Sequence, residues 1–210
     1  PFLILARDSI LLIVLNTVLQ RYGGPGEGDT LVTCATIVQS YLLLITMPMG
    51  GITLGSQPVV SFNYGKGDAE RIKKAILCIT GLCVTFCILM TIVTWTVSPV
   101  YVQLFTEDPV ILSRSVTYIK RFTFMIIPLA VQYPLVDETT ALGKVKLALF
   151  CSAFRKFVFL TGLILLPALL TADAAFFSEP VADVVSATMT SCLFFHFFPK
   201  ILKEREKITI

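Results

Sequence analysis

The chain has few charged residues and long stretches with none. Charged residues make up 15% of the 210 residues, whereas a soluble domain averages about 25%. No charged residue occurs from Thr30 to Gly65 or from Ala75 to Thr106. A membrane-spanning helix needs about 20 mostly apolar residues, and both stretches exceed that length. The scarcity of charge therefore excludes a soluble domain and indicates an integral membrane protein.

The sequence also lacks the motifs of common enzymes. It has no Gly-x-Ser-x-Gly, no His-Glu-x-x-His and no phosphate-binding glycine-rich loop that ends in Lys and Ser or Thr. An enzyme, and a pump driven directly by ATP, are therefore disfavoured. The six cysteines lie in or beside apolar stretches, so we predict neither a disulfide framework nor a metal site. No apolar stretch offers a basic and aromatic groove, so we expect no nucleic-acid partner.

The apolar runs predict six membrane-spanning helices. The runs are continuous, whereas a transmembrane β-barrel shows short segments of alternating hydrophobicity. Glycine, proline and charged residues separate the runs. We therefore predict an all-α membrane protein in which residues 1–210 form a single transmembrane lobe. The predicted spans are residues 2–20, 31–60, 75–98, 117–142, 147–170 and 182–199, followed by a basic cytoplasmic tail at 200–210.

Basic and acidic connections alternate along the chain. The connections after the second and fourth spans are basic, as is the tail, whereas the first, third and fifth connections are mainly acidic. Cytoplasmic loops carry the excess of Lys and Arg in membrane proteins. We therefore predict a multi-pass protein of the cytoplasmic (inner) cell membrane with both ends in the cytoplasm. The net charge of +3 follows from this topology.

Charged residues within the predicted spans are candidate functional residues, because placing a charge in a bilayer costs free energy. Asp8, next to Arg7 in the first span, has two interpretations. It is a cation or proton site that faces the bundle interior, or it is a structural ion pair or helix end near the interface. The sequence leaves both open.

Asp137 and Glu138 lie a few residues before Gly143-Lys144. Their position near a basic loop favours interfacial carboxylates that face the nearby lysines. A gate or coupling site close to the cytoplasmic mouth is the alternative. Arg155 is interpreted as reaching the headgroup region or as a partner for Asp137.

The second predicted span is longer than a bilayer requires and contains residues that disfavour helix. Pro48, Gly50, Gly51 and Pro58 all lie within it. Proline removes a backbone hydrogen bond and bends a helix. A helix broken at membrane depth is tolerated where it lines a cavity or is buried in protein, and such a break points to a transport site. We predict a break here, with a kinked packing helix as the alternative.

Uncharged polar residues and methionines within the spans are candidates for a substrate cavity. Methionine is flexible and polarisable, which suits a surface that accepts different ligands. Amide side chains bond either to a substrate or to another helix, and lipid-facing packing is the common alternative for methionine. The candidates are Asn16, Gln39, Met47, Met49, Gln57 and Gln132.

Three motifs give the chain a family resemblance. The stretch Met47-Pro48-Met49-Gly50-Gly51, followed by Gly55-Ser56-Gln57-Pro58 and Ser61-Phe62-Asn63-Tyr64-Gly65, resembles the multidrug and toxic compound extrusion (MATE) family. The basic start of the next helix, Asp68 to Lys74, is similar too. So is Ala141-Leu142-Gly143-Lys144 with Arg155 beyond it. The resemblance extends over nearly the whole chain.

The resemblance implies a function and an architecture. Members of the family have twelve spans in two six-helix lobes and export drugs against an inward flow of Na⁺ or H⁺. This chain resembles the second, C-terminal lobe, and because it starts at Pro1 we interpret it as a fragment. Its expected partners are drug-like small molecules, the lipid bilayer and an N-terminal lobe. The resemblance implies no cofactor beyond the coupling ion, and it makes Asp8, Asp137 and Glu138 candidates for binding that ion.

Two alternatives to drug export remain. One is a related flippase for a lipid-linked or polysaccharide precursor, which would need a cationic central cavity for an anionic headgroup. The other is a membrane remnant or assembly subunit that transports nothing.

Overall fold

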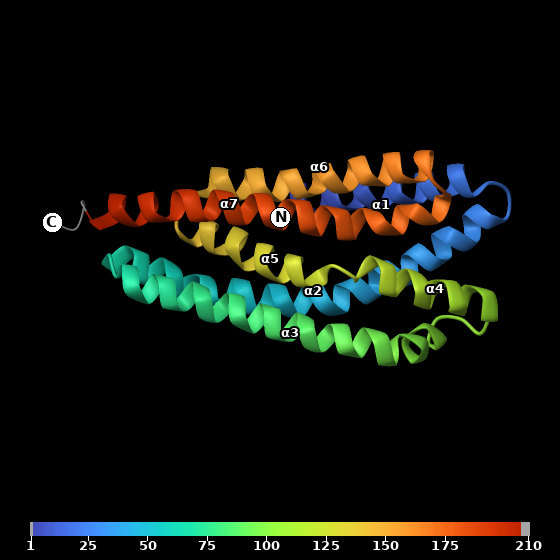
Figure 1. Cartoon of the computed structure of the whole chain (residues 1–210), viewed down its shortest axis with the longest axis horizontal. Coiled ribbons are helices and arrows are strands. Elements are labelled where there is room, and N and C mark those ends of the chain that lie inside the picture. The colour runs from blue at the N-terminus through green and yellow to red at the C-terminus, as the bar shows by residue number, and fades with distance from the viewer. Residues whose placement is uncertain (1, 207–210) are drawn as a thin grey trace. The chain divides into compact units, whose positions relative to one another are not determined.

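The chain is helical throughout the part that the structure describes. The structure is a computed structural model that describes the backbone of residues 2–206 and the side chains of residues 10–203. No strand occurs within residues 2–206, and the predicted all-α class is confirmed. The helices are α1 (Phe2–Gly23), α2 (Glu27–Lys66), α3 (Ala69–Gln103), α4 (Pro109–Phe122), α5 (Ile126–Ala141), α6 (Val145–Leu169), the 3-10 helix η1 (Ala172–Phe177) and α7 (Ser178–Glu206) (Figure 1).

These helices follow the order of the predicted spans. Four helical segments are long and apolar enough to cross a bilayer, namely α2, α3, α6 and the segment Ala172–Lys203, which includes most of α7. Helices α4 and α5 meet the same criteria together, as one interrupted span. In α1, the stretch Ile10–Gly23 is a shorter apolar helix.

Several helices continue beyond the spans that hydropathy predicts. The third predicted span, 75–98, ends at Ser98. In the structure, Ser98 and the following Pro99 both lie inside α3, which ends at Gln103. Residues 200–206 of the predicted tail continue α7. These differences share one reason. Hydropathy reports the part of a helix that lies in lipid, whereas a helix also continues into the headgroup and water regions.

Helix α2 is continuous from Glu27 to Lys66, so the predicted break in it is wrong. Pro48 and Pro58 both lie inside the helix, as do Gly50 and Gly51. A proline removes only its own N–H from the ladder of hydrogen bonds, and the bonds on either side hold the helix together. Glycine lowers helix propensity by about 1 kcal/mol relative to alanine, which a long helix tolerates.

The interruption occurs instead in the fourth predicted span, between α4 and α5. Thr123 ends α4 with φ −97° and ψ 3°, and its hydroxyl donates to the carbonyl of Ile119 at 2.8 Å. Met125 precedes α5 with φ −108° and ψ 38°. Pro128 follows in the first turn of α5, where its missing N–H leaves no helical acceptor without a donor. In a continuous helix, the carbonyl of Phe124 would have no donor, because its usual partner would be the N–H of residue 128, which proline lacks.

The contacts divide the chain into two compact units. Unit 1 contains the three mainly acidic connections, and unit 2 contains the two basic connections together with the C-terminal part of α7. The alternation of charge along the sequence thus corresponds to a grouping of the connections in space. Unit 1 is Pro1–Leu43, Ile92–Phe124 and Phe157–Ala182, and unit 2 is Leu44–Thr91, Met125–Lys156 and Asp183–Ile210.

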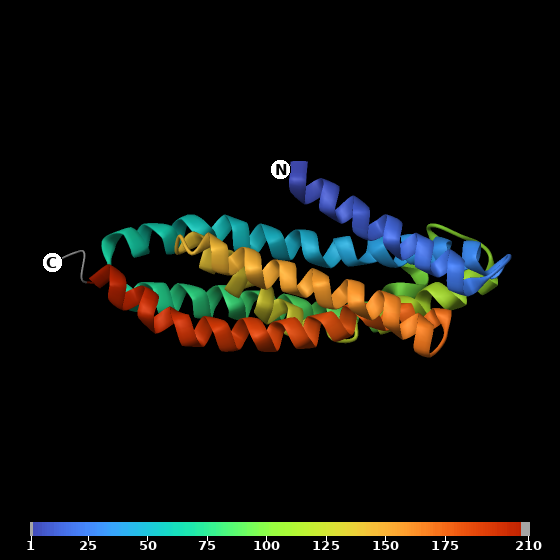
Figure 2. The same ribbon diagram turned by 90° about the horizontal axis from the view of Figure 1, so that it is seen from above.

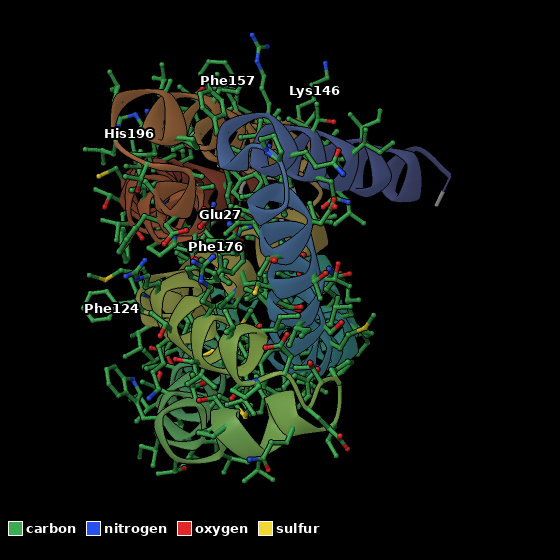
Figure 3. All side chains as sticks on the ribbon, turned by 90° about the vertical axis from the view of Figure 1, so that its right-hand side faces the viewer. Glu27, Phe124, Lys146, Phe157, Phe176 and His196 are labelled. Carbon is green, nitrogen blue, oxygen red and sulfur yellow. The ribbon has the colours of Figure 1, made fainter. Side chains whose placement is uncertain are left out.

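Unit 1 is organised around η1, which packs against α1 and α4. The ring of Tyr118 stacks on that of Phe176 with centroids 4.0 Å apart, and its hydroxyl donates to Asp173 Oδ1 at 2.7 Å. Figure 3 shows Phe176 among the helices and Phe124 pointing outward. The 3-10 turn is therefore anchored to α4 by one stacked ring pair and one hydrogen bond.

Unit 2 contains an apolar cluster that joins four helices. On α3 its members recur at intervals of three and four residues, which places them on one helix face. This cluster packs α2, α3, α5 and α7 together. Its buried members are Val60, Ile72, Ile76, Ile79, Leu135, Leu142, Phe194, Ile201 and Leu202.

Helices α1 and α2 approach each other closely where they join. Figure 2 shows the short connection between the two helices. Gly24 and Gly26, within this connection, have φ of +73° and +82°, which favours glycine. Just beyond, a Cβ atom on Gly28 would lie 3.0 Å from Gln20 Cα and 3.1 Å from Gln20 O. Both neighbours are backbone atoms that cannot rotate away, so only glycine fits at position 28.

We expect Gly28→Ala to destabilise the complete protein by about 1–3 kcal/mol, the usual cost of overpacking. Gly55→Ala is the matched control, because a Cβ there meets nothing within 4 Å. That variant should be neutral or more stable by about 0.5–1 kcal/mol, since alanine favours helix over glycine. Unfolding in detergent measures both variants, and equal stabilities would contradict the close approach.

Candidate functional site

Two neighbouring carboxyl groups on α5 face two hydroxyl groups on α2. Thr53 Oγ1 lies 2.5 Å from Asp137 Oδ2, and Ser56 Oγ lies 3.2 Å from Glu138 Oε1. Residues three apart on a helix share a face, so both hydroxyls point toward α5. All four residues belong to unit 2.

The hydroxyl and carboxyl groups are part of a longer polar seam between α2 and α5. Gln57 Nε2 donates to the backbone oxygen of Asp137 at 3.3 Å, and Ser61 Oγ donates to that of Ala141 at 3.0 Å. The α2 residues of the seam follow the helical repeat, at positions 53, 56, 57 and 61. Polar contacts therefore hold the two helices together over more than two turns.

Gly50 lies at one end of the seam, near Tyr133 of α5. A Cβ on Gly50 would lie 3.8 Å from the hydroxyl oxygen of Tyr133 on α5. Gly50 also supplies a carbonyl oxygen 3.2 Å from Thr53 Oγ1. The motif that was predicted to break α2 thus provides part of its contact with α5.

Burial distinguishes the two carboxyl groups. Glu138 is fully buried, with 0% of its surface exposed, and its Oε2 has no hydrogen-bond partner among the described residues. Asp137 is half-buried. The interpretation of Glu138 as an interfacial carboxylate is therefore wrong. Its distance along the sequence from Lys144 gave no information on which way the side chain faces.

The MatE family model matches residues 6–166, which include both helices of the seam. The chain belongs to the MatE family. The family resemblance that the sequence motifs indicated is therefore confirmed.

Solved structures of MATE proteins share the fold of this MatE chain at low sequence identity. A crystal structure of MATE in complex with MaL6 matches with a TM-score of 0.85 and 16% identity, over 93% of this chain and 44% of that one. The outward-facing conformation of a multidrug resistance MATE family transporter gives 0.84 and 16% over the same shares. A mutant of the Vibrio cholerae MATE transporter VcmN gives 0.83 and 15%, also with 93% and 44% coverage. The search of curated proteins found no match.

This MatE chain spans less than half the length of those solved chains. At 15–16% identity, the likeness shows the fold alone. Asp8, the ion-coupling candidate of the first predicted span, lies in α1, and its side chain is outside the described residues. Among the described side chains, the ion-coupling candidates are therefore Asp137 and Glu138.

The candidates for a substrate cavity do not form one cluster. Met49 is fully buried and its Sδ lies 3.7 Å from Cys87 Sγ, whereas Met47 is 70% exposed. Two residues apart on a helix, these side chains point in different directions. Gln57 joins the seam, and Gln132 is buried and donates to Thr190 Oγ1 on α7 at 3.3 Å.

The two remaining cavity candidates, Asn16 and Gln39, belong to unit 1, and both are half-buried. Asn16 Oδ1 is buried without a hydrogen-bond partner among the described residues. A role for either residue in a substrate cavity stays a prediction.

A buried ion pair joins α6 to α7 in unit 2. Arg155 Nη2 and Nε lie 2.8 Å and 3.1 Å from Asp183 Oδ1, and the two side chains are 14% and 2% exposed. Arg155 thus contacts Asp183, a partner that was not predicted for it. Asp183 lies in the sixth predicted span, and no partner was predicted for it. Pro180 lies in the first turn of α7, where proline is favoured, so Asp183 falls just inside the helix.

We expect Arg155→Ala or Asp183→Ala to destabilise the complete protein by about 3–5 kcal/mol each, because each leaves a buried charge without its partner. The double variant should lose much less than the sum of the single effects. Arg114 and Glu27 provide a control pair, with 38% and 53% exposure and a 2.9 Å contact. Removing either of these residues should cost about 1 kcal/mol at most.

Chemical unfolding of all six variants in detergent gives the two coupling energies. Additive effects at Arg155 and Asp183 would show that the pair contributes nothing to stability.

Proposed function

We propose that this chain is the second, C-terminal lobe of an exporter that moves drug-like organic compounds out of the cell against an inward flow of cations or protons. The observation that carries the proposal is the pair of carboxyl groups on α5, of which Glu138 is buried and Asp137 half-buried, facing hydroxyl groups of α2. Membership of the MatE family supports it. The N-terminal six-helix lobe would supply the other wall of the substrate pathway.

The carboxyl pair suits ion coupling because its charge depends on what it binds. Glu138 has no exposed surface, so a change of its charge alters the free energy of the α2–α5 contact. An ion drives alternating access only if it binds one conformation better than the other. In the seam, the hydroxyl contacts form with the carboxyl groups themselves, so an ion bound there would change the α2–α5 contact.

The buried charges favour substrates that carry positive charge. The charged residues that are fully buried in the described part of the chain are all acidic: Glu138, Glu179 and Asp183. Arg155 and Asp183 neutralise each other, so this pair favours neither sign of substrate charge. A flippase for an anionic lipid-linked precursor would need a cationic cavity, and the described interior does not favour one.

The charge of the connections supports a topology. We propose that the basic connections of unit 2 face the cytoplasm of a cell whose cytoplasmic membrane holds the protein, with both ends of the chain on that side. Asp8 remains a second candidate for the coupling ion, through its position in α1.

We expect Glu138→Gln to lower gradient-driven efflux by about tenfold or more, within the 5–150-fold range typical of coupled sites. Asp137→Asn should act in the same direction. The assay uses the complete protein in liposomes, a fluorescent cationic dye and an imposed Na⁺ or H⁺ gradient. Glutamine keeps the size of glutamate but neither binds a proton in this range nor carries charge, so packing is preserved.

Glu107→Gln is the matched control, because Glu107 is exposed in the connection before α4. It should leave efflux unchanged. Dye binding measured without a gradient separates lost coupling from lost substrate affinity. Wild-type efflux by both α5 variants would remove the carboxyl pair from the coupling role, and no gradient-driven efflux by the wild-type protein would favour a non-transporting subunit.

A further inference from the structure

Two cations of α4 lie against aromatic rings at the end of that helix, beside the interruption of the span. Lys120 Nζ lies 5.0 Å from the centre of the Trp95 ring on α3, and the guanidinium carbon of Arg121 lies 5.5 Å from that of Phe177 in η1. All four residues belong to unit 1. The face of an aromatic ring attracts a cation, most strongly for tryptophan. The rings therefore hold both cations beside the last turn of α4.

Both cations retain N–H groups that need an acceptor. Lysine has three N–H donors and arginine has five. Neither Lys120 nor Arg121 donates a hydrogen bond to, or forms an ion pair with, any of the residues that the structure describes. Arg114, two turns earlier on α4, differs, because its Nη1 lies 2.9 Å from Glu27 Oε1. Lys120 and Arg121 can therefore take an anionic acceptor from outside the described part of the chain.

The cations lie on the outward side of α4. Lys120 and Arg121 come three and four residues after Thr117, so these three residues share one side of the helix. Thr117 is exposed, Lys120 and Arg121 are half-buried, and Phe124, just beyond the end of α4, is exposed. Figure 3 shows Phe124 pointing away from the helices. The cations are therefore accessible from outside, beside exposed apolar side chains.

Helix α3 gives the depth of this surface in a bilayer. It contains Lys74 near its basic start and continues without interruption to Gln103. Each residue adds about 1.5 Å to a helix, so Trp95 lies about 30 Å from Lys74 along the axis. The hydrocarbon core of a bilayer is also about 30 Å thick. Trp95, whose side chain is exposed, therefore lies at the boundary opposite the basic connections, where tryptophan is favoured, and Lys120 lies there with it.

We propose that Lys120 and Arg121 bind the phosphate group of an anionic phospholipid in the leaflet opposite the basic connections. Trp95 and Phe177 hold the two cations in place for it. A phosphate supplies both the negative charge and the oxygen acceptors that the N–H groups need. A lipid is favoured over a free phosphate ion because its headgroup already lies at this boundary. Its acyl chains extend along exposed apolar side chains deeper in the bilayer, such as that of Ile92 on α3.

The fluorescence of Trp95 provides a direct test, because bromine atoms on an acyl chain quench tryptophan only at close range. The complete protein is placed in phosphatidylcholine bilayers that contain, at equal mole fractions, either brominated phosphatidylglycerol, which is anionic, or brominated phosphatidylcholine, which is neutral overall. The part of the quenching that Trp95→Phe abolishes belongs to Trp95. The ratio of the two apparent binding constants is the preference for the anionic lipid.

We expect a preference of roughly five- to twenty-five-fold in the wild-type protein, because each cation near an anionic headgroup contributes about fivefold to binding. Lys120→Met and Arg121→Met should each lower the preference by about fivefold, since methionine keeps an unbranched side chain but no charge. The double variant should have no preference. Equal binding of the two lipids by the wild-type protein, or an unchanged preference in the double variant, would overturn the proposal.

Two features of the design separate binding from an effect on the tryptophan itself. Each preference is a ratio within one variant, so a change in the unquenched fluorescence cancels, and unchanged quenching by the neutral lipid shows that Trp95 still lies at the boundary. Arg121 lies against the rings of Tyr118 and Phe177 and not that of Trp95. An effect of Arg121→Met therefore comes through the lipid. Lys120→Arg keeps the charge and should keep the preference.

Lys74→Met is the matched control, because Lys74 is an exposed lysine near the other end of the helix that carries Trp95. It should leave the preference unchanged, and an equal loss in this variant would reduce the effect to the overall charge of the protein and overturn the proposal. Inorganic phosphate, added at constant ionic strength, should not displace the brominated lipid. Displacement would show a site for free anions and overturn the assignment to a lipid. These measurements need no transport, so their outcome is independent of the proposed function.

Discussion

The bilayer interior offers no hydrogen-bond partner, and the structure of this chain follows from that constraint. The backbone satisfies it by forming helices, in which every internal N–H and C=O pairs within its own segment. Side chains are under the same constraint. Glu138 is buried against a hydroxyl of α2, and Arg155 is buried against Asp183 on α7. Glu138 and Arg155 thus each have a polar partner on a neighbouring helix.

Hydropathy was sufficient to predict the helices but not their interruptions. A long apolar run such as that in α3 or α6 has no alternative to a helix in lipid, so its existence follows from composition alone. A proline does not have one structural outcome. Pro48 sits inside α2 without ending it, because the neighbouring turns stay bonded, whereas Pro128 falls at the start of α5, where its missing N–H is harmless. The position of a proline relative to the neighbouring turns decides between these outcomes.

The sequence also identified Asp137 and Glu138 as candidate functional residues, because a charged side chain inside a membrane span costs free energy. It could not say which way they face, since that depends on the rotation of α5 against its neighbours. Neither Thr53 nor Ser56 was predicted to be a site residue, because both are neutral and lie on another helix. A hydroxyl pair three residues apart, opposite adjacent carboxyls, is informative only when the two helices are known to touch.

Unit 2 buries its carboxyl groups in two different ways, and the difference indicates which of them can change state. Asp183 lies against Arg155, a guanidinium that stays charged at every accessible pH, so the pair has one stable charge state and serves as a fixed joint between α6 and α7. Glu138 lies against a hydroxyl, which both donates and accepts. A hydroxyl partner therefore tolerates either protonation state, at the cost of turning its single hydrogen. For this reason the α2–α5 seam, and not the ion pair, is the part of unit 2 in which the partner of a carboxyl group suits either protonation state.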